Sequence, residues 1–177
     1  RELNLEECAV ALPSLTAIAL HCPQLTVLRL GYTAVDDGTL RRLATACPDL
    51  AELDLTACAA VSIGGLNSAL LHMERLRRLS LCWNDQVATL AVRHAEIEYL
   101  SFSFCKKLQD DCLLATAFAC PSIVCLDLAW CSGLTQRGIE GVFGTLPHLK
   151  SLNLRGVGAV SNRTLQTMRR FGVNILK

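Results

Sequence analysis

The sequence lacks the features that mark membrane proteins and nucleic-acid-binding proteins. Its 17 lysine and arginine residues nearly balance its 16 aspartate and glutamate residues, which leaves a formal net charge of +1. A protein with so little net charge has no overall field that would attract nucleic acid or an acidic membrane. No uninterrupted apolar run approaches the roughly 18 residues of a membrane-spanning helix. We therefore expect neither nucleic acid nor a membrane among its partners.

The sequence also lacks the motifs of catalysis and of metal or cofactor binding. Gly64-Gly65 has neither the lysine nor the spacing of a phosphate-binding loop. No C-x-x-C motif and no cysteine–histidine pair has the spacing of metal ligands. The four histidines fall in separate segments, where we expect them on the surface: His21, His72, His94 and His148. We expect no enzymatic activity, no metal and no cofactor, which leaves binding to other proteins as the function.

What the sequence does contain is a repeat, and residues 123–148 show it in full. Ile123, Leu126 and Leu128 have L-x-x-L-x-L spacing, and Cys131 follows three residues later. This alternation suits a short strand with one buried face, and the second half of the segment has the apolar spacing of a helix. Because neither half can bury its apolar side alone, each unit needs a neighbour on both sides.

Similar units follow one another along the chain. After a partial first unit, they begin at Leu25, Leu50, Leu76, Ile97, Ile123 and Leu149. Their spacing of 21 to 26 residues lies in the range of leucine-rich repeats. The sequence therefore predicts an α/β leucine-rich-repeat solenoid of about six to seven repeats, curved like a horseshoe. We expect parallel strands on its concave face and helices on its convex face.

We expect residues 1–177 to form a single domain. Arg1 falls inside the first strand and Lys177 just inside a further unit, and neither end shows an atypical capping repeat. We therefore expect a segment of a longer chain.

The fourth unit, residues 76–96, is about five residues shorter than its neighbours, and the loss falls in its helical half. We expect Val87, Leu90 and Val92 to fill its core from a turn or two of helix or from a 3₁₀ connector. A thinner unit on the convex side should locally relax the curvature, because strands stack more closely than helices do.

The ten cysteines follow the repeat pattern and do not suggest a disulfide framework. Seven of them occupy either the ninth position of a unit or the end of its helical half: Cys8, Cys58, Cys105 and Cys131, and Cys22, Cys47 and Cys120. At such positions cysteine acts as a small apolar core residue and needs no partner. We expect all ten thiols to be reduced, which fits a cytoplasmic or nuclear protein.

Polar residues mark where the helices should begin. The expected capping residues are Asp36 or Asp37, Ser62, Asp110 or Asp111, Thr135 and Ser161. In the fifth unit we expect Leu114 and Phe118 to face the core. Gly172 is expected to end the last helix.

The repeat subtype resembles a known family. A unit of 26 residues with cysteine at the ninth position and Cys-Pro after the helix is similar to the cysteine-containing repeats of F-box/LRR proteins. The segments LSLCWNDQVATL and LDLAWCSGLTQRGI carry this resemblance most clearly, whereas Thr33, Asn84 and Val157 replace the ninth-position cysteine.

The resemblance implies the substrate-recognition arm of an SCF-type E3 ubiquitin ligase. In that family an F-box that binds a Skp1-type adaptor precedes the repeats, and these residues contain no F-box. The alternative is a structural scaffold protein without ligase activity, for example in a ciliary or axonemal assembly.

The repeat pattern also names the surface that a protein partner would contact. Strand positions between the core residues should line the concave face, and the eighth position should lie at its rim. The expected protein-binding residues are Tyr32, Trp83, Tyr99, Phe104, Trp130, Arg29, Arg78, Asp127 and Arg155. Large aromatic side chains dominate binding energy at interfaces. The alternative is that the eighth-position aromatics stack on one another and seal the edge of the core.

Overall fold

The computed structural model describes residues 1–86, 89–158 and 160–177. Within these residues, eight three-residue strands form one parallel sheet in the order of the sequence. They are β1 (Glu2–Asn4), β2 (Val27–Arg29), β3 (Glu52–Asp54), β4 (Arg78–Ser80), β5 (Tyr99–Ser101), β6 (Cys125–Asp127), β7 (Ser151–Asn153) and β8 (Asn174–Leu176).

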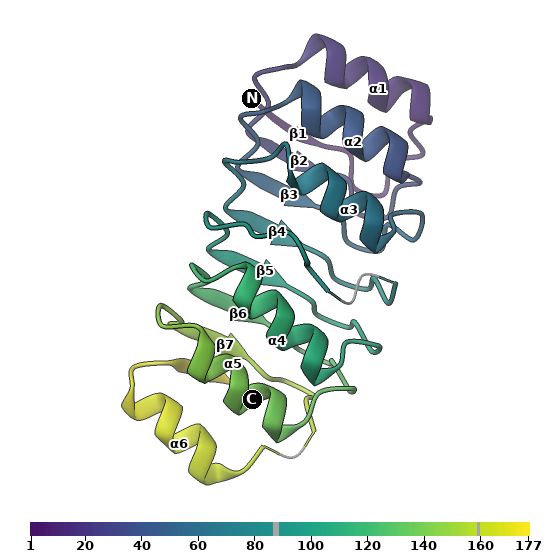
Figure 1. Cartoon of the computed structure of the whole chain (residues 1–177). Helices are drawn as coiled ribbons and strands as arrows, with labels where there is room; N and C mark the ends of the chain where they lie inside the picture. Colours follow the sequence, from purple (N-terminus) through teal and green to yellow (C-terminus); the bar gives the residue numbers. More distant parts are fainter. Residues whose placement is uncertain (87–88, 159) are drawn as a thin grey trace.

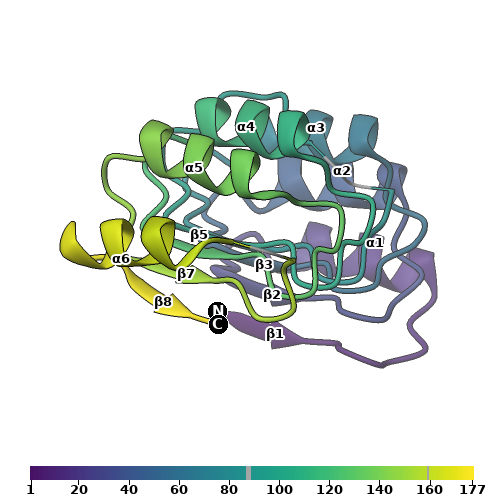
Figure 2. The same ribbon diagram turned by 90° about the horizontal axis from the view of Figure 1, so that it is seen from below.

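Helices cover one face of this sheet (Figure 1). Those in the described parts of the chain are α1 (Leu12–His21), α2 (Asp37–Ala46), α3 (Ile63–Leu70), α4 (Asp110–Ala119), α5 (Gln136–Thr145) and α6 (Asn162–Arg170). Figure 2 shows the helices following an arch on the outer side and the strands lying beneath them on the inner side. The chain is therefore an α/β leucine-rich-repeat solenoid, as the repeat pattern predicts. None of the helices described has both the length and the apolar content to cross a membrane.

The core is a stack of equivalent residues from successive units. Leu28, Leu53, Leu79, Leu100 and Leu126 each lie directly beside the next one along the sheet. All five are at most 2% exposed. The predicted register is therefore confirmed, and each unit buries its apolar side only against its neighbours.

A ladder of side-chain hydrogen bonds joins the units at the ninth position. The Cys58 thiol lies 3.1 Å from the Leu30 carbonyl oxygen of the preceding unit, and the Asn84 amide donates to the Leu55 oxygen at 2.7 Å. Cys105 and Cys131 repeat the contact with Leu81 and Phe102. In these four units the ninth residue is a small donor that reaches back one unit, and asparagine makes the same contact as cysteine. Thr33 instead donates to the Leu30 carbonyl oxygen of its own unit, and Val157 fills the position without a donor.

The first unit departs from the predicted cysteine pattern. Cys8 and Cys22 are exposed, whereas the equivalent Cys58 and Cys47 are buried. In the structure no preceding unit packs against the first one, so its two cysteines have nothing to cover them.

The fifth unit corrects two expectations. Helix α4 begins after Gln109, which makes no side-chain capping bond, and the Asp110 carboxylate instead accepts hydrogen bonds from the Thr135 N–H and hydroxyl of the next unit. Leu113 faces the core, whereas Phe118 is 70% exposed.

The inward face of α4 is thus one residue out of phase with the prediction. Its buried residues are Leu113, Thr116 and Ala117, and Leu114 is only half-buried. Adjacent leucines at 113 and 114 made the phase ambiguous, and the inward threonine hid the pattern. Elsewhere the capping predictions hold: the side chains of Asp36, Ser62, Thr135 and Ser161 each accept a backbone N–H from the first turn of their helix.

The fourth unit closes its core without a helix in residues 76–86 and 89–96. Leu90 is fully buried and Val92 is half-buried, while Val87 lies outside the described residues. Neighbouring helices supply the missing partners: the Leu90 N–H donates to the Thr116 hydroxyl at 3.0 Å, and the Ala91 N–H donates to Asn67 Oδ1 at 3.1 Å. The expected helical turn or 3₁₀ connector is therefore wrong for the described part of the unit, because flanking side chains satisfy the backbone instead.

His94 is buried, which corrects the expectation that it lies on the surface. It is 5% exposed and occupies the position that Cys47 holds in the second unit. Its Nε2 lies 2.8 Å from the Met73 carbonyl oxygen, the same backward contact that Cys47 makes with Cys22. Because a carbonyl oxygen only accepts, Nε2 carries the proton, and the buried Nδ1 has no partner among the described residues.

Candidate protein-binding surface

The eighth position of every unit has an unusual backbone. Its residues have left-handed φ values of 54° to 69°, and they are Glu7, Tyr32, Ala57, Trp83, Phe104, Trp130 and Gly156. Glycine adopts this conformation without strain, whereas bulky side chains there cost about 1–2 kcal/mol. The fold tolerates that strain in three successive units that carry a large ring.

Backbone hydrogen bonds lock each of these turns to the next unit. The Trp83 N–H donates to the Ser103 oxygen at 2.9 Å, and the Phe104 N–H donates to the Ala129 oxygen at 2.8 Å. The Trp130 N–H bonds to the Arg155 oxygen at 2.7 Å in the same way. The backbone that carries each ring is therefore held by the same contact in all three units.

Trp83, Phe104 and Trp130 stack along the rim of the concave face, and we call these three residues the aromatic column. The centroids of the Trp83 and Phe104 rings are 4.2 Å apart with an interplanar angle of 7°. Those of Phe104 and Trp130 are 6.0 Å apart at 14°. The three rings thus stack on one another, and the column still presents large apolar area, since Trp83 and Trp130 are 49% and 52% exposed.

Gly156 closes the column at its C-terminal end. A Cβ at this residue would collide with the indole of Trp130, so the backbone of the seventh unit lies directly against the ring. At the other end, Ala57 has no ring, and Tyr32 lies beyond it. Tyr32 therefore belongs to the same row but not to the stack.

The charged residues of the concave face form a second group. Glu52 lies between two arginines, with Oε1 2.6 Å from the Arg29 guanidinium and Oε2 3.4 Å from that of Arg78. The hydrogen bond with Glu52 raises the pKa of Arg29. Arg78 in turn lies over the Tyr99 ring, 4.3 Å from its centroid, and burial raises the pKa of that tyrosine. Tyr99 therefore lies in this charged group and not in the aromatic column.

A chain of hydrogen bonds connects neutral side chains between two aspartates. The Thr56 hydroxyl donates to Asp54 Oδ1 at 2.6 Å, and the Ser103 hydroxyl donates to Asp127 Oδ1 at 3.2 Å. Ser80, Cys82 and Ser101 continue from Thr56 through contacts of 3.1 to 3.4 Å, and the backbone N–H of Ser103 donates to Ser101 Oγ at 3.4 Å. The middle of the surface is thus polar and uncharged, and its donors and acceptors are already ordered before any partner binds.

The predicted protein-binding residues therefore lie in separate groups. The structure brings Trp83, Phe104 and Trp130 together, groups Arg29 and Arg78 with Tyr99, and leaves Tyr32 and Arg155 at opposite ends of the rim. Sequence reasoning missed the role of Glu52 as the shared partner of two arginines. The signal was partial: Arg78 lies at the strand position equivalent to Glu52, whereas Arg29 lies opposite Asp54 and reaches Glu52 diagonally.

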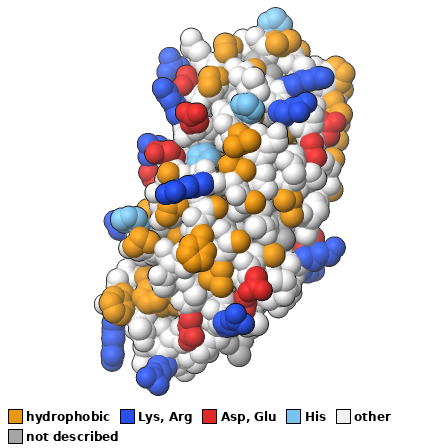
Figure 3. All heavy atoms as spheres, in the orientation of Figure 1, with side chains coloured by type: hydrophobic (Ala, Val, Ile, Leu, Met, Phe, Trp, Pro, Cys, Tyr) orange, Lys and Arg blue, Asp and Glu red, His pale blue; other side chains and the backbone are white. Residues whose placement is uncertain are grey.

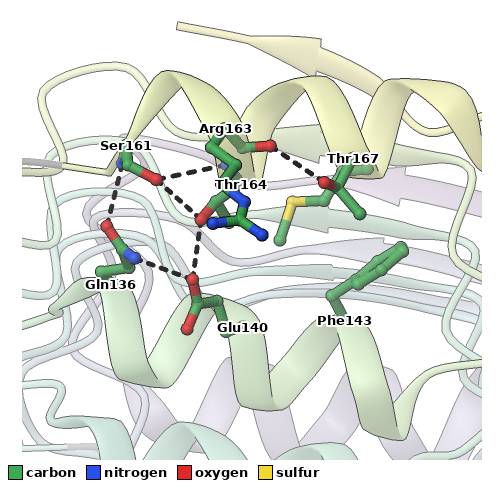
Figure 4. A pocket seen from close by; sticks show the side chains of 8 residues that line it. Gln136, Glu140, Phe143, Ser161, Arg163, Thr164 and Thr167 are labelled. Carbon is green, nitrogen blue, oxygen red and sulfur yellow. Dashed lines mark hydrogen bonds between the residues drawn. The ribbon is translucent and has the colours of Figure 1, made fainter.

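Other parts of the surface offer weaker sites. A hollow of about 380 Å³ separates α5 and α6 above Phe143 and Met168 (Figure 4). Its polar groups are paired with one another: Gln136 bonds to Ser161 and Glu140, and Glu140 accepts from Thr164. Figure 3 shows apolar side chains over the middle of the helix-bearing face. Phe118 in α4 and Leu71 at the end of α3 are both exposed. The described residues contain no group of histidine, cysteine and acidic side chains that could hold a metal ion.

Comparison with known proteins supports the fold and finds curated relatives of low identity. No family model matches the chain. It is similar to the BTB/POZ domain-containing protein FBL11 of Arabidopsis thaliana, with 26% identity over 142 residues, 78% of this chain and 15% of that protein. It is also similar to the antagonist of mitotic exit network protein 1 of Eremothecium gossypii, with 31% identity over 137 residues, 72% of this chain and 35% of that protein. The chain thus spans well under half the length of either relative.

Solved structures show the same architecture. The chain superposes on a chain of the yeast Rad7 and Elc1 complex with a TM-score of 0.68 at 18% identity, over 98% of this chain and 53% of the other. The leucine-rich repeat-containing protein LegL7 of Legionella pneumophila superposes with a TM-score of 0.52 at 19% identity, over 93% of this chain and 68% of that chain. An internalin of Listeria monocytogenes superposes with a TM-score of 0.54 at 14% identity, over 99% of this chain and 53% of that chain. These likenesses establish the leucine-rich-repeat fold, a fold typical of protein interaction.

Proposed function

We propose that this chain is a protein-interaction module that holds its partner on the concave face and along the aromatic column. The observation that carries the proposal is the column itself. Three large rings stand at left-handed backbone positions that glycine would occupy with less strain, and two of them remain about half exposed. Trp and Tyr are the residue types that dominate binding energy at interfaces.

The middle of the concave face supports the same proposal. Its serine, threonine and cysteine side chains are already hydrogen-bonded in a fixed arrangement, so a partner does not have to order them. A partner that covers this surface would gain polar contacts in the middle and apolar contacts along the rim, the usual division of a protein interface.

The finer proposal is that the module is the substrate-recognition arm of an SCF-type ubiquitin ligase. It is supported by the resemblance of the repeats to those of F-box/LRR proteins, and by the likeness to Rad7, which was solved in complex with Elc1. On this proposal the full-length protein would carry an F-box that binds a Skp1-type adaptor. The alternative is a scaffold protein that binds its partner through the same surface without an adaptor. Reduced thiols would place either in the cytoplasm or nucleus, with a cilium or axoneme as a further site for the scaffold.

The experiment isolates the full-length protein from cells as wild type, Trp83→Ala, Trp130→Ala and Phe118→Ala. Phe118 is the matched control, because it is an exposed ring on the helix-bearing face. We expect the two tryptophan variants to lose the same partner, with binding weakened by about 2 kcal/mol or more, while Phe118→Ala retains it. Equal retention by all four proteins would contradict the binding surface.

The ligase and scaffold proposals separate in the same samples. Recovery of Skp1 together with adaptor-dependent ubiquitylation of the partner supports the ligase arm. Recovery of the partner without Skp1 supports the scaffold. Thermal melting of each variant shows whether a loss of binding reflects unfolding, since a binding residue leaves the melting temperature nearly unchanged.

A further inference from the structure

We propose that the space above Ala57, between Tyr32 and Trp83, receives an arginine side chain of the protein partner. This inference rests on the proposed function and names the chemistry that part of its surface would recognise. We call this space the Ala57 slot.

The slot lies in the row of rings at the position where Ala57 carries no ring. Ala57 has the same left-handed backbone as its neighbours, with φ of 54° against 58° for Tyr32 and 61° for Trp83. Equivalent backbone bonds hold the three turns: Tyr32 to Thr56, Ala57 to Cys82 and Trp83 to Ser103, all at 2.7 to 2.9 Å. The Cα–Cβ bonds therefore leave the turns in the same direction, and only the side chain at the middle position is short.

The width of the slot fits one planar group. Two strand steps separate Tyr32 from Trp83, which places their positions about 9.6 Å apart at about 4.8 Å per step. A planar group halfway between would lie about 5 Å from either ring, within the range of cation–π contact. Tyr32 and Trp83, the rings on either side of the slot, are 51% and 49% exposed and are therefore accessible to a partner.

The charge beside the slot favours a cation. Asp54 Oδ1 accepts hydrogen bonds from both the N–H and the hydroxyl of Thr56, the residue before Ala57. The Glu6 side chain reaches across Gly31 toward the same threonine, since a Cβ built on Gly31 would lie 3.6 Å from Glu6 Oε1 and 3.5 Å from Thr56 Cβ. Neither carboxylate forms an ion pair within the described parts of the chain: Arg29, which lies opposite Asp54 on the neighbouring strand, is paired with Glu52.

The same half of the surface is acidic as a whole. At the concave and rim positions of units one to four, five carboxylates (Glu2, Glu6, Glu7, Glu52 and Asp54) outnumber the two guanidinium groups of Arg29 and Arg78. In units five to seven, one carboxylate, Asp127, balances one guanidinium group, that of Arg155. A positively charged partner group is therefore drawn toward the N-terminal half, where the slot lies.

Arginine fits both the narrow width of the slot and the negative charge beside it better than other residues do. Its guanidinium is planar and stacks on aromatic faces, and its N–H groups can donate to nearby carboxylates. A lysine ammonium matches the charge but is not planar, and an aromatic or proline ring matches the shape but leaves Asp54 and Glu6 without a cation.

The test uses three five-residue peptides that differ only at a central residue flanked by serine and glycine: arginine, lysine or citrulline. Citrulline keeps the planar shape of arginine and removes its charge. Saturation-transfer NMR with the full-length protein measures binding over a range of peptide concentrations. We expect the arginine peptide to bind about three- to tenfold more tightly than either control peptide, the range that a cation–π contact provides. Equal binding of the three peptides, or no binding of the arginine peptide, would overturn the proposal.

Ala57→Phe tests the place of binding. Phe104 occupies the equivalent position in its own unit with a similar backbone, so the variant should fold and should complete the row of rings. We expect it to lose the preference for the arginine peptide with a melting temperature at or above that of wild type. Ala60→Phe is the matched control, because it adds the same ring at an exposed residue three positions further along the same unit, and it should bind as wild type does.

The natural partner distinguishes this inference from the proposed function. If Trp130→Ala releases the partner and Ala57→Phe does not, the protein-binding surface stands and the slot is wrong. If both release it, and replacing one arginine of the partner by lysine has the same effect as Ala57→Phe, the slot is the site of that arginine.

Discussion

In the sixth unit, residues 123–148, a ten-residue helix follows the strand, whereas the fourth unit returns to the sheet without a helix in its described residues. Their strands are nevertheless equivalent. β4 pairs with β3 and β5 in the same register that β6 has with β5 and β7. The comparison shows that the helix layer can lose an element while the concave surface stays continuous.

The fourth unit keeps its fold by taking partners from its neighbours. In the regular second and seventh units, residues of the unit itself cap the helix and fill the core. In the fourth unit, Thr116 and Asn67 of the flanking helices satisfy its backbone, and His94 makes the backward contact of the usual cysteine. Its stability should therefore depend more on adjacent units than that of a complete repeat does.

The largest expected effect on stability is the same in the sixth unit, which has a helix, and in the fourth unit, whose described residues have none. Leu126→Ala in the sixth unit and Leu90→Ala in the fourth each remove a side chain that is at most 2% exposed. We expect each to lower the free energy of unfolding by about 2–5 kcal/mol, measured by chemical denaturation. Because units couple to their nearest neighbours, hydrogen exchange should increase in the adjacent repeats as well. A melting temperature equal to wild type for either variant would mean that its side chain is not in the core.

His94→Ala tests whether the fourth unit depends on its histidine. The change removes one of two donors to the Met73 carbonyl oxygen, which keeps its bond from the Leu76 N–H, and it leaves a cavity where the buried ring lay. We expect a loss of about 1–3 kcal/mol in the free energy of unfolding from the lost hydrogen bond and the cavity together. His72→Ala is the control at an exposed histidine and should stay within about 0.5 kcal/mol of wild type. If the two variants were equally stable, the buried position of His94 would be wrong.

A smaller effect is expected at a regular helix start. Asp36 accepts the Thr39 N–H at 2.8 Å, and Asp36→Ala should cost about 1 kcal/mol, measured by thermal melting. The same hydrogen bond lowers the pKa of the Asp36 carboxyl. The charged form is therefore favoured in the folded state, so this stabilisation is present above the ordinary pKa and is lost as pH falls below it. Asp36→Asn retains a capping oxygen and should lose that part of the acid sensitivity, whereas an unchanged acid profile would show that the carboxylate is not involved.

The smallest effect on stability is expected from modification of the exposed thiols. Burial raises the pKa of Cys105, Cys120 and Cys131 to about 12, so at neutral pH these thiols stay protonated and unreactive. An alkylating reagent applied to folded residues 1–177 should label Cys8 and Cys22 first, because no unit covers them there, and should leave the melting temperature unchanged. Mass spectrometry locates the labels, and after denaturation without reductant all ten cysteines should react. Recovery of native disulfides would contradict the reduced state.

Much of the fold follows from the sequence, because the repeat places equivalent residues at a fixed spacing. The core leucines, the buried ninth-position cysteines and the capping roles of Ser62 and Ser161 were all predictable from that register. The phase of α4 was not, because adjacent leucines at 113 and 114 fit two faces of a helix equally well. The burial of His94 was also missed, although it lies three residues before Ile97, just as Cys47 lies three residues before Leu50.

For the candidate site, the sequence predicted the row of aromatic residues but not its internal arrangement. Eighth-position spacing alone places Tyr32, Trp83, Phe104 and Trp130 in one row. The stacking of three rings, the separation of Tyr32 by Ala57 and the sharing of Glu52 between two arginines depend on side-chain geometry. The backbone register determines where each Cβ lies, and contacts with neighbouring units determine the conformation of the side chain.

The solenoid follows from the repeat pattern alone, because stacking buries the leucines that recur about every 26 residues in amphipathic units. The closure of the fourth unit without a helix depends on contacts in the folded molecule, because its partners come from Asn67, Thr116 and Met73, more than 20 residues away in each case. The left-handed backbone of the eighth position depends on such contacts as well. That conformation arises where each turn bonds to the next unit, a contact that local sequence does not contain.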